Sequence, residues 1–338
     1  MPYVACKPGA RISGTAIDPC AAAPLRIAHP MTEPPLISVI VPCYNARPWI
    51  AAALRSVLSQ GVGPLQVLVV DDGSQDETGA FVAQAFPAVQ VLRQTNAGVA
   101  AARNRGLAAA HGRWVAFIDA DDLWLPGKLS AQLAALQAQP EARMAYTAWQ
   151  VWESEAPEPD PQWLQTLPAH LPGPSGDVYP DLLLECAVWT STVLADRALL
   201  QELGGFDQAL PVGEDYDLWL RASRLTPMLR VPQPLALYRQ HPRSLTRRAP
   251  ARNWQALVVQ RAVQRWGYTG PSGRQADPAA VRRALATSWR DFAGAQLAAG
   301  QAAQGWAAAR QALQGDWRHP GAWKLAVKAA AQRLGLPA

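Results

Sequence analysis

The sequence of 338 residues lacks several features that mark common protein classes. Its four cysteines (Cys6, Cys20, Cys43 and Cys186) lie far apart and form no CxxC pair, which argues against a zinc ribbon, a thioredoxin motif or a disulfide scaffold and suits a reducing cytoplasm. No uninterrupted apolar run reaches about 18 residues, so no membrane-spanning helix is expected. No glycine-rich loop containing Lys or Arg follows the first apolar run, which disfavours a nucleotidyl transferase.

Acidic residues are scarce in the last part of the chain. The segment from Arg239 to Ala338 contains 16 Lys and Arg but only three Asp, a net charge of +13, whereas the first 238 residues carry a net charge of −8. An acidic half favours a cation site, and a basic tail favours an anionic partner such as a lipid surface or phosphate. A purely solubilising basic surface is the alternative. No nucleic-acid recognition module is present, so nucleic acid is not expected as a partner.

Short apolar runs alternate with helical segments after a Pro-, Ala- and Gly-rich start. Residues 1–35 are expected to be disordered, and Met31 is a candidate for the natural start. The apolar runs predict buried parallel strands at Leu36–Pro42, Leu65–Val70, Val89–Leu92 and Trp114–Ile118. This alternation predicts an α/β fold with a doubly wound sheet and a ligand at the carboxyl ends of its strands.

The remainder of the chain is less regular and then helical. Residues 153–180 are Pro-rich and predict an irregular insertion. Val188–Leu194 is expected to form a strand and Asp215–Arg224 a helix. From Pro250 onward the pattern is helical, and small residues over 293–320 are spaced like one hairpin of a tetratricopeptide-type repeat. One hairpin cannot bury both of its faces, so it is expected to pack on the sheet domain or on a partner.

Acidic residues follow two of the predicted strands. Asp119 and Asp121 lie two residues apart after the fourth strand, where extended residues would project on one side. Two such carboxylates can hold Mg²⁺ or Mn²⁺ while phosphate oxygens complete the coordination shell. Asp71 and Asp72 follow the second strand and can accept from a uracil imide or a ribose hydroxyl. The alternatives are a solvated strand end and an Asx turn.

Ordered motifs over about Leu36 to Thr246 resemble the family 2 glycosyltransferases of the GT-A fold. These motifs are Ser38-Val-Ile-Val-Pro-Cys-Tyr-Asn45, Val69-Val-Asp-Asp-Gly-Ser74, Asn96-Ala-Gly-Val-Ala-Ala-Ala-Arg-Asn-Arg-Gly106, Phe117-Ile-Asp-Ala-Asp-Asp122, Gly204-Gly-Phe-Asp207, Gly213-Glu-Asp-Tyr-Asp-Leu-Trp-Leu-Arg221 and Tyr238-Arg-Gln-His241. The resemblance implies a GT-A domain over residues 36–248, followed by an all-helical basic region over 249–338. It also implies a nucleotide-sugar donor, a divalent metal (Mn²⁺ or Mg²⁺) and inversion at the anomeric carbon.

The resemblance also assigns roles to individual residues of this sequence. The nucleotide site implied by the motifs comprises Pro42, Tyr44, Asp71, Asp72, Arg103 and Asp119. The metal is expected at Asp121 with Asp119, and the catalytic carboxylates at Asp215 and Glu214. The positions implied near the diphosphate or acceptor are Arg239 and His241, and Trp189 is a further candidate there. UDP is the favoured nucleotide because Asp71 can accept from the uracil imide.

An inverting transfer needs one base, and Asp215 is the candidate that takes the proton of the acceptor hydroxyl. A helix N-cap is the alternative role for Asp215, and Glu214 either orients the acceptor or caps the same helix. His241 has an alternative as an exposed turn residue, and Trp189 either stacks on a sugar or packs in the core. Cys43 is expected to be a small core residue.

Processive synthases of the resembled family carry a QxxRW motif, and the nearest sequence here is Ala262-Val-Gln-Arg-Trp266. We therefore expect a non-processive enzyme that extends a cell-surface glycan or lipid-linked acceptor. The basic tail contains tryptophans, which favours peripheral attachment to an anionic membrane at the cytoplasmic face of the inner membrane. These tryptophans can instead fill the core of the helical region. A non-catalytic nucleotide-sugar-binding or scaffold protein is the alternative function.

Overall fold

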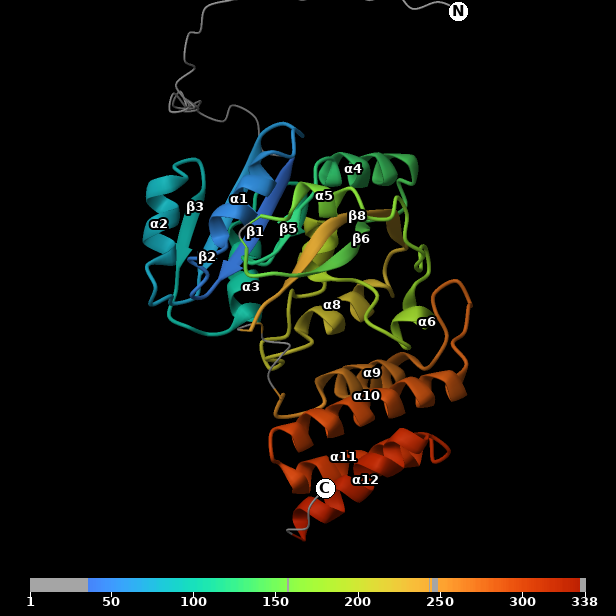
Figure 1. The fold of residues 1–338 in the computed structure, drawn as a ribbon. Coiled ribbons are helices and arrows are strands. Elements are labelled where there is room, and N and C mark those ends of the chain that lie inside the picture. Colours follow the sequence, from blue (N-terminus) through green and yellow to red (C-terminus); the bar gives the residue numbers. More distant parts are fainter. Residues whose placement is uncertain (1–35, 157, 243, 245–248, 335–338) are drawn as a thin grey trace, which may run out of the picture. The chain divides into compact units, whose positions relative to one another are not determined.

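The computed structural model describes residues 36–156, 158–242, 244 and 249–334. A mixed eight-stranded sheet runs in the order β3-β2-β1-β4-β7-β6-β8-β5 (Figure 1). Its strands are β1 (Ile37–Cys43), β2 (Leu65–Asp71), β3 (Gln90–Arg93), β4 (Trp114–Phe117), β5 (Leu123–Trp124), β6 (Met144–Glu153), β7 (Val193–Asp196) and β8 (Met228–Gln240). The predictions for residues 1–35, including Met31 as the natural start, lie outside the described residues.

The first four strands form the parallel half of the sheet. β1 lies between β2 and β4, and β3 pairs with the outer side of β2, all in parallel. All seven residues of β1 are buried, as are all four of β4, because both strands are central. The four predicted parallel strands are therefore confirmed to within one residue at each end. Their carboxyl ends come together at one edge, which is where both acidic clusters follow.

The second half of the sheet is mixed, which the expectation of a parallel sheet did not include. β7 runs antiparallel to both β4 and β6, and β5 runs antiparallel to β8. Val188–Leu194 is not one strand, because a 3-10 turn at Thr190–Thr192 precedes β7. The predicted strand therefore begins five residues later, after a turn whose hydroxyl groups contribute to the site described below.

Helices pack on both faces of the sheet and fill two hydrophobic cores. The helices of this part of the chain are α1 (Ile50–Leu58), α2 (Thr78–Ala85), α3 (Val99–Ala109), α4 (Lys128–Ala138), α5 (Pro161–Leu164), α6 (Tyr179–Leu182), α7 (Arg197–Glu202) and α8 (Glu214–Ala222). Of these, α5 packs on a smaller cluster that includes Leu123 and Trp152. One core includes Val39, Leu54 and Val67, and the other includes Ile40, Phe117 and Trp219. Residues 39 and 40 point to opposite faces of β1, so the strand's alternation divides these two cores.

The segment 153–180 was expected to be irregular, and after the end of β6 its described residues form the short helix α5 and the beginning of α6. It is nevertheless fastened to the sheet, because Leu171 N–H donates to the Pro232 carbonyl at 2.8 Å and Gly176 bridges to Met228. The hydroxyl of Tyr146, on β6, also donates to the Pro174 carbonyl. The insertion therefore runs beside β8, with extended stretches of chain between its helices.

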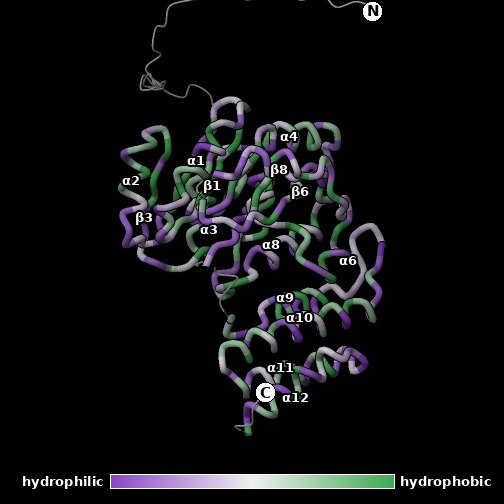
Figure 2. The backbone as a smooth tube through the Cα atoms, in the orientation of Figure 1, coloured by the Kyte–Doolittle hydropathy of each residue, from purple (hydrophilic) through white to green (hydrophobic). Residues whose placement is uncertain are grey.

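The C-terminal part of the described chain is helical, as predicted. It comprises α9 (Trp254–Trp266), α10 (Pro278–Ala298), α11 (Ala302–Gly315) and α12 (Pro320–Arg333). Along these helices hydrophobic and hydrophilic residues alternate (Figure 2), as expected of amphipathic helices. Contacts of the Tyr179 hydroxyl with the Ala262 and Gly267 carbonyls fasten α9 to the sheet domain.

The tryptophans of the helical region divide into two groups. Trp254 and Trp266 pack against the core of the sheet domain, and Trp289 and Trp306 pack in the core of the last three helices. Trp317, which precedes α12, and Trp323, in the first part of α12, are exposed. Of the six, only Trp289 and Trp306 thus pack against the core of the helical region, as the alternative interpretation held. Among the described residues, no helix combines the length and apolar character that crossing a bilayer requires.

Candidate active site

A pocket of about 310 Å³ lies beside the carboxyl ends of β2 and β3. Asp71, Gly73, Ser74, Arg93 and Gln94 are among the residues that line it. The pocket therefore lies where the sequence predicted a nucleotide site, and it presents one buried carboxylate beside one arginine.

Asp71 is held in place by its own turn and by close packing. One of its oxygens accepts from the Ser74 N–H at 2.9 Å, and the other lies 3.9 Å from Arg93 Nε. A Cβ atom at Gly79 would lie 2.2 Å from Asp71 Oδ2, so only glycine leaves the carboxylate its present position. Asp71 is 5% exposed and has a fixed orientation at the pocket wall.

Asp72 has a different environment from its neighbour. Its two oxygens accept from Gln94 Nε2 at 2.7 Å and from the N–H groups of Ala97 and Gly98 at 2.9 Å. Gly98 is the N-cap residue of α3, so Asp72 stabilises the loop that leads into this helix. The predicted contact of Asp72 with the nucleotide remains a prediction, and its contacts here hold the loop.

The end of β1 carries the other residues predicted to line the nucleotide. Pro42 is buried and pairs in register with Val70, whereas Tyr44 is 49% exposed just beyond the strand. Cys43 is 4% exposed within a hydrophobic core, as expected of a small core residue. Burial raises the pKa of its thiol, so it stays protonated near neutral pH. Tyr44 is thus the residue at this strand end with surface available to a ligand.

Arg103 connects the two acidic motifs of the site. Its guanidinium donates to Asp119 Oδ1 at 2.7 Å and, through its other terminal nitrogen, to Glu214 Oε1. Arg103 is 3% exposed and Glu214 is 5% exposed, so the contact between them is buried. The Phe206 ring lies 5.4 Å from the guanidinium carbon. One fixed cation therefore joins the end of β4 to the beginning of α8.

The carboxylates of Asp119 and Asp121 are suited to hold a divalent cation together with the oxygens of a diphosphate. Their side chains are 25% and 31% exposed, and carboxylate oxygens are ligands that Mg²⁺ and Mn²⁺ accept. Burial and the charge of Asp121 raise the pKa of Asp119 despite the nearby Arg103, and a bound cation would offset this repulsion. The described residues include no cluster of three His, Cys, Asp or Glu that could hold a metal unaided. Oxygens of water or of a bound diphosphate can complete the coordination shell.

Asp122, for which the sequence suggested no separate role, anchors the same turn through buried hydrogen bonds. Its oxygens accept from Ser191 Oγ at 2.5 Å, Trp189 Nε1 at 3.1 Å and the Arg239 N–H at 3.0 Å. It is 1% exposed, and burial together with the charges of Asp121 and Asp119 raises its pKa well above the usual range. Its place directly after the two carboxylates was the only signal in the sequence.

The two carboxylates at the beginning of α8 have distinct partners. Asp215 Oδ2 accepts from the Thr190 hydroxyl at 2.6 Å, and Oδ1 lies 2.7 Å from the Tyr216 N–H. The N-cap residue of α8 is Gly213, so neither acidic residue occupies the N-cap position. Burial and the neighbouring Asp215 raise the pKa of Glu214 to about 7, against the effect of Arg103. Thr190, which no sequence signal indicated, thereby fixes the orientation of the Asp215 carboxylate.

The residues predicted near the diphosphate lie around Asp121. His241 Nε2 is 3.0 Å from Asp121 Oδ2, and its ring stacks on Trp49 with centroids 3.9 Å apart. The alternative of an exposed turn histidine is wrong, because His241 is 4% exposed. Arg239 is fully buried, and its Nε donates to the Asp121 carbonyl at 2.7 Å. Trp189 is partly exposed among Trp149 and Tyr238, so its two alternatives remain open.

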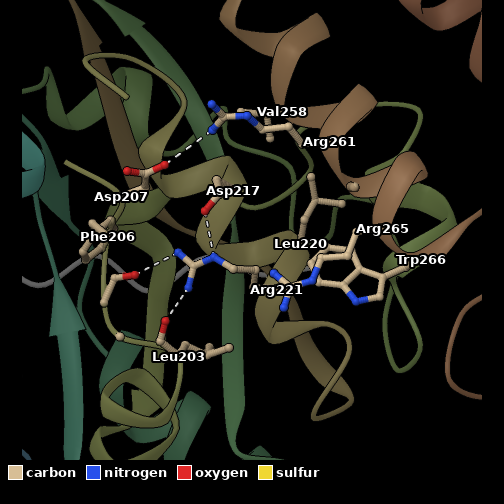
Figure 3. A pocket seen from close by; sticks show the side chains of 13 residues that line it. Leu203, Phe206, Asp207, Asp217, Leu220, Arg221, Val258, Arg261, Arg265 and Trp266 are labelled. Atoms are coloured by element: carbon tan, nitrogen blue, oxygen red, sulfur yellow. Dashed lines mark hydrogen bonds and ion pairs between the residues drawn. The ribbon is translucent and has the colours of Figure 1, made fainter. Parts of the chain in front are cut away.

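A second pocket shows how two sequence motifs are joined (Figure 3). It measures about 400 Å³ and is lined by the 203–207 loop, α8 and α9. Arg221 donates to Asp217 at 2.7 Å and to the carbonyls of Leu203 and Gly205 at 2.7 and 2.8 Å (Figure 3). Arg221 thus fixes the loop that carries Phe206 relative to the helix that begins with Glu214 and Asp215.

Comparison with known proteins gives family matches over the sheet domain. Residues 38–172 match the model of Glycosyl transferase family 2. UDP-Glc:alpha-D-GlcNAc-diphosphoundecaprenol beta-1,3-glucosyltransferase WfgD of Escherichia coli is 32% identical over 55% of this chain and 68% of its own length. Putative teichuronic acid biosynthesis glycosyltransferase TuaG of Bacillus subtilis is 33% identical over 48% and 63%. An uncharacterized glycosyltransferase of Rickettsia bellii is 30% identical over 55% of this chain, and the match spans only 26% of that relative's length.

Solved structures share the fold at lower identity. S. aureus TarS 1-349 in complex with UDP-GlcNAc has a TM-score of 0.58 at 16% identity, covering 89% of this chain and 92% of that one. Mannosyltransferase PcManGT from Pyrobaculum calidifontis, in complex with GDP-Man and Mn²⁺, has a TM-score of 0.52 at 22% identity, covering 93% and 86%. The fold is thus GT-A with additional C-terminal helices, as the motifs predicted. The chain belongs to glycosyl transferase family 2.

Proposed function

We propose that the protein transfers one sugar per encounter from a UDP-sugar to a hydroxyl of a lipid-linked or cell-surface glycan, with inversion at the anomeric carbon. Residues 36–248 form the catalytic domain in this proposal, and 249–338 the helical region. The donor assignment draws support from the uridine nucleotides named for WfgD and TarS. The acceptor assignment draws support from the diphosphoundecaprenol-linked sugar in the name of WfgD.

The observation that carries the proposal is the double contact of Arg103. By binding both Asp119 and Glu214, it brings the turn that contains Asp119 and Asp121 close to the beginning of α8, where Asp215 lies. These two motifs are 95 residues apart in the sequence when measured from Asp119 to Glu214. A transferase needs this proximity, because the leaving diphosphate and the attacking hydroxyl lie on opposite sides of one carbon.

In this proposal some residues bind the donor and others transfer a proton. Asp71 accepts a hydrogen bond from the base, and Tyr44 covers the nucleotide. Asp215, held by Thr190, takes the proton of the acceptor hydroxyl as the bond to the anomeric carbon forms and the bond to the diphosphate breaks. A divalent cation at Asp121 and Asp119 would stabilise the negative charge on the departing diphosphate when it is bound. His241 and Arg239 hold Asp121 and its backbone in position.

Calorimetric titration of UDP, GDP and dTDP, each with Mn²⁺, Mg²⁺ or EDTA, tests the donor site. The proposal predicts metal-dependent binding of UDP by the wild type and its loss in Asp121→Ala. Asp207→Ala is the matched control, because Asp207 is a partly exposed carboxylate in the loop beside α9, and it should leave UDP binding unchanged. Preference for GDP or dTDP would overturn the UDP assignment, and binding unaffected by EDTA and by Asp121→Ala would overturn the metal site.

A further inference from the structure

The outward face of α12 carries an apolar stripe that the fold does not use. Trp323, Val327 and Leu334 are 53%, 67% and 74% exposed. At about 100° per residue they fall within a sector of roughly 40°, so they share one face of the helix and its C-cap. A separate face of the helix, centred roughly 115° from the stripe, is buried through Ala322, Ala326 and Ala329 and packs the helix against its neighbours.

Basic side chains border this stripe on both sides. Lys324 and Lys328 are exposed on one flank, and Arg333 is exposed on the other. From Trp317 to Leu334 the sequence has four Lys and Arg and no acidic residue. The face therefore combines exposed apolar groups with a uniform positive charge.

Trp317 extends the apolar surface beyond the beginning of the helix. It is 66% exposed, and its carbonyl accepts from the Trp323 indole N–H at 2.8 Å. The Arg318 guanidinium lies 5.2 Å from the Trp317 ring centroid. The two exposed tryptophans are therefore coupled by a hydrogen bond, and a cation lies next to them.

We propose that this face docks on an anionic lipid bilayer. The basic tail led us to expect membrane attachment, and the proposal assigns that attachment to a specific surface. We call this surface the α12 outer face. It comprises Trp317, Arg318, Trp323, Lys324, Val327, Lys328, Arg333 and Leu334. It does not depend on the sugar-transfer chemistry, because membrane binding is measured without donor or acceptor.

The charge pattern selects a bilayer over the other occupants. A second copy of the same face would place like charges opposite one another, which disfavours a symmetric dimer. Tryptophan side chains are enriched where lipid headgroups meet the hydrocarbon region, and lysines on the flanks can reach anionic headgroups. Exposed Trp flanked by basic side chains, as Trp323 is by Lys324 and Lys328, is typical of a helix lying in this interface.

Sedimentation of the full chain with vesicles tests the proposal. The vesicles contain phosphatidylcholine alone or equal parts of phosphatidylcholine and phosphatidylglycerol, at low and high salt. Two variants change the face: Lys324→Glu with Lys328→Glu, and Trp317→Ala with Trp323→Ala. Arg105→Glu with Arg113→Glu is the matched control, because it reverses two exposed charges in the sheet domain. All substituted side chains are exposed, and thermal unfolding verifies that each variant is folded.

The proposal predicts binding to phosphatidylglycerol vesicles, little binding to phosphatidylcholine, and weakening by salt. The lysine reversal should reduce partitioning by about tenfold or more. The tryptophan variant should also reduce it, and the control should match the wild type. Absence of vesicle binding by the folded wild type would overturn the proposal, as would equal losses in the control and in the lysine variant. Self-association abolished by the tryptophan variant, without vesicle binding, would assign the face to a protein interface instead.

Discussion

The hydroxyl of Thr190 donates a hydrogen bond of 2.6 Å to Oδ2 of Asp215. Thr190 belongs to the turn that precedes β7, and Asp215 belongs to the first turn of α8. The next residue of that turn, Ser191, donates to Asp122, which directly follows Asp121 in the sequence. A single turn therefore orients the proposed base and supports the acidic turn proposed to bind the metal.

Thr190→Val should lower kcat by about tenfold to a hundredfold, because a hydrogen bond to a charged group contributes about 1.5–3 kcal/mol. Val has a similar shape, so the fold and UDP affinity should be retained. Steady-state kinetics with calorimetric UDP binding measure both effects. Thr190→Ser, which keeps the hydroxyl, should recover most of the rate, and equal losses in the Val and Ser variants would contradict a role for this hydrogen bond.

Arg103→Met should destabilise the protein by about 3–5 kcal/mol, because it leaves a buried carboxylate without its cation. Glu214 is that carboxylate, and Glu214→Gln introduced into the Arg103→Met background should recover part of the loss. Urea unfolding of the four members of this cycle measures the coupling. Additive losses would show that Arg103 and Glu214 stabilise the fold independently.

Gly79→Ala should weaken UDP binding by about tenfold or more, since one misplaced hydrogen bond to a base costs about 1.4 kcal/mol or more. The added Cβ would lie 2.2 Å from Asp71 Oδ2 and 3.1 Å from Arg93 Nε, so the carboxylate must shift. Gly63→Ala is the comparison, because no atom lies within 4 Å of its Cβ, although its backbone φ of +85° adds local strain. Unchanged UDP affinity in Gly79→Ala would show that the uracil base does not bind at Asp71.

Lys128 should make stability rise with pH above neutrality. Burial lowers its pKa well below the usual range, although its Nζ contacts Gln132 Oε1 at 2.8 Å. The unfolded chain then binds a proton that the folded chain lacks, up to a pH of about 10.4. Urea unfolding at pH 7, 8 and 9 should show the wild type gaining stability relative to Lys128→Met. Parallel pH profiles of the two proteins would mean that Lys128 is charged in the folded state.

The parallel strands and their acidic ends were predictable because each is encoded locally. An apolar run such as Trp114–Phe117 followed by Asp119 and Asp121 needs no long-range information to be recognised. The Arg103 contacts were only partly predictable, because the motifs named the residues but not their pairing. Which of the two carboxylates near the beginning of α8 would meet Arg103 depends on the packing of α3 against α8.

β8 was not predicted, and its sequence explains why. It contains Pro232 and Pro234, which normally argue against a central strand. The pairing of β6 with β8 shifts register between Thr147 and Trp149, where Ala148 lies opposite Pro234. This irregularity accommodates the prolines. Likewise Thr190 carries no sequence signal, since a threonine in an apolar stretch is equally typical of a buried strand.

The central claim is that Asp215 removes the proton of the acceptor hydroxyl, and Asp215→Asn tests it most directly. UDP release from UDP-sugars with a diphospholipid-linked sugar acceptor measures turnover, and calorimetry measures UDP affinity in the same preparation. The account predicts a loss of turnover of about 10²–10⁴-fold, as for removal of a general base, with UDP affinity unchanged. Turnover within a few fold of the wild type would contradict it.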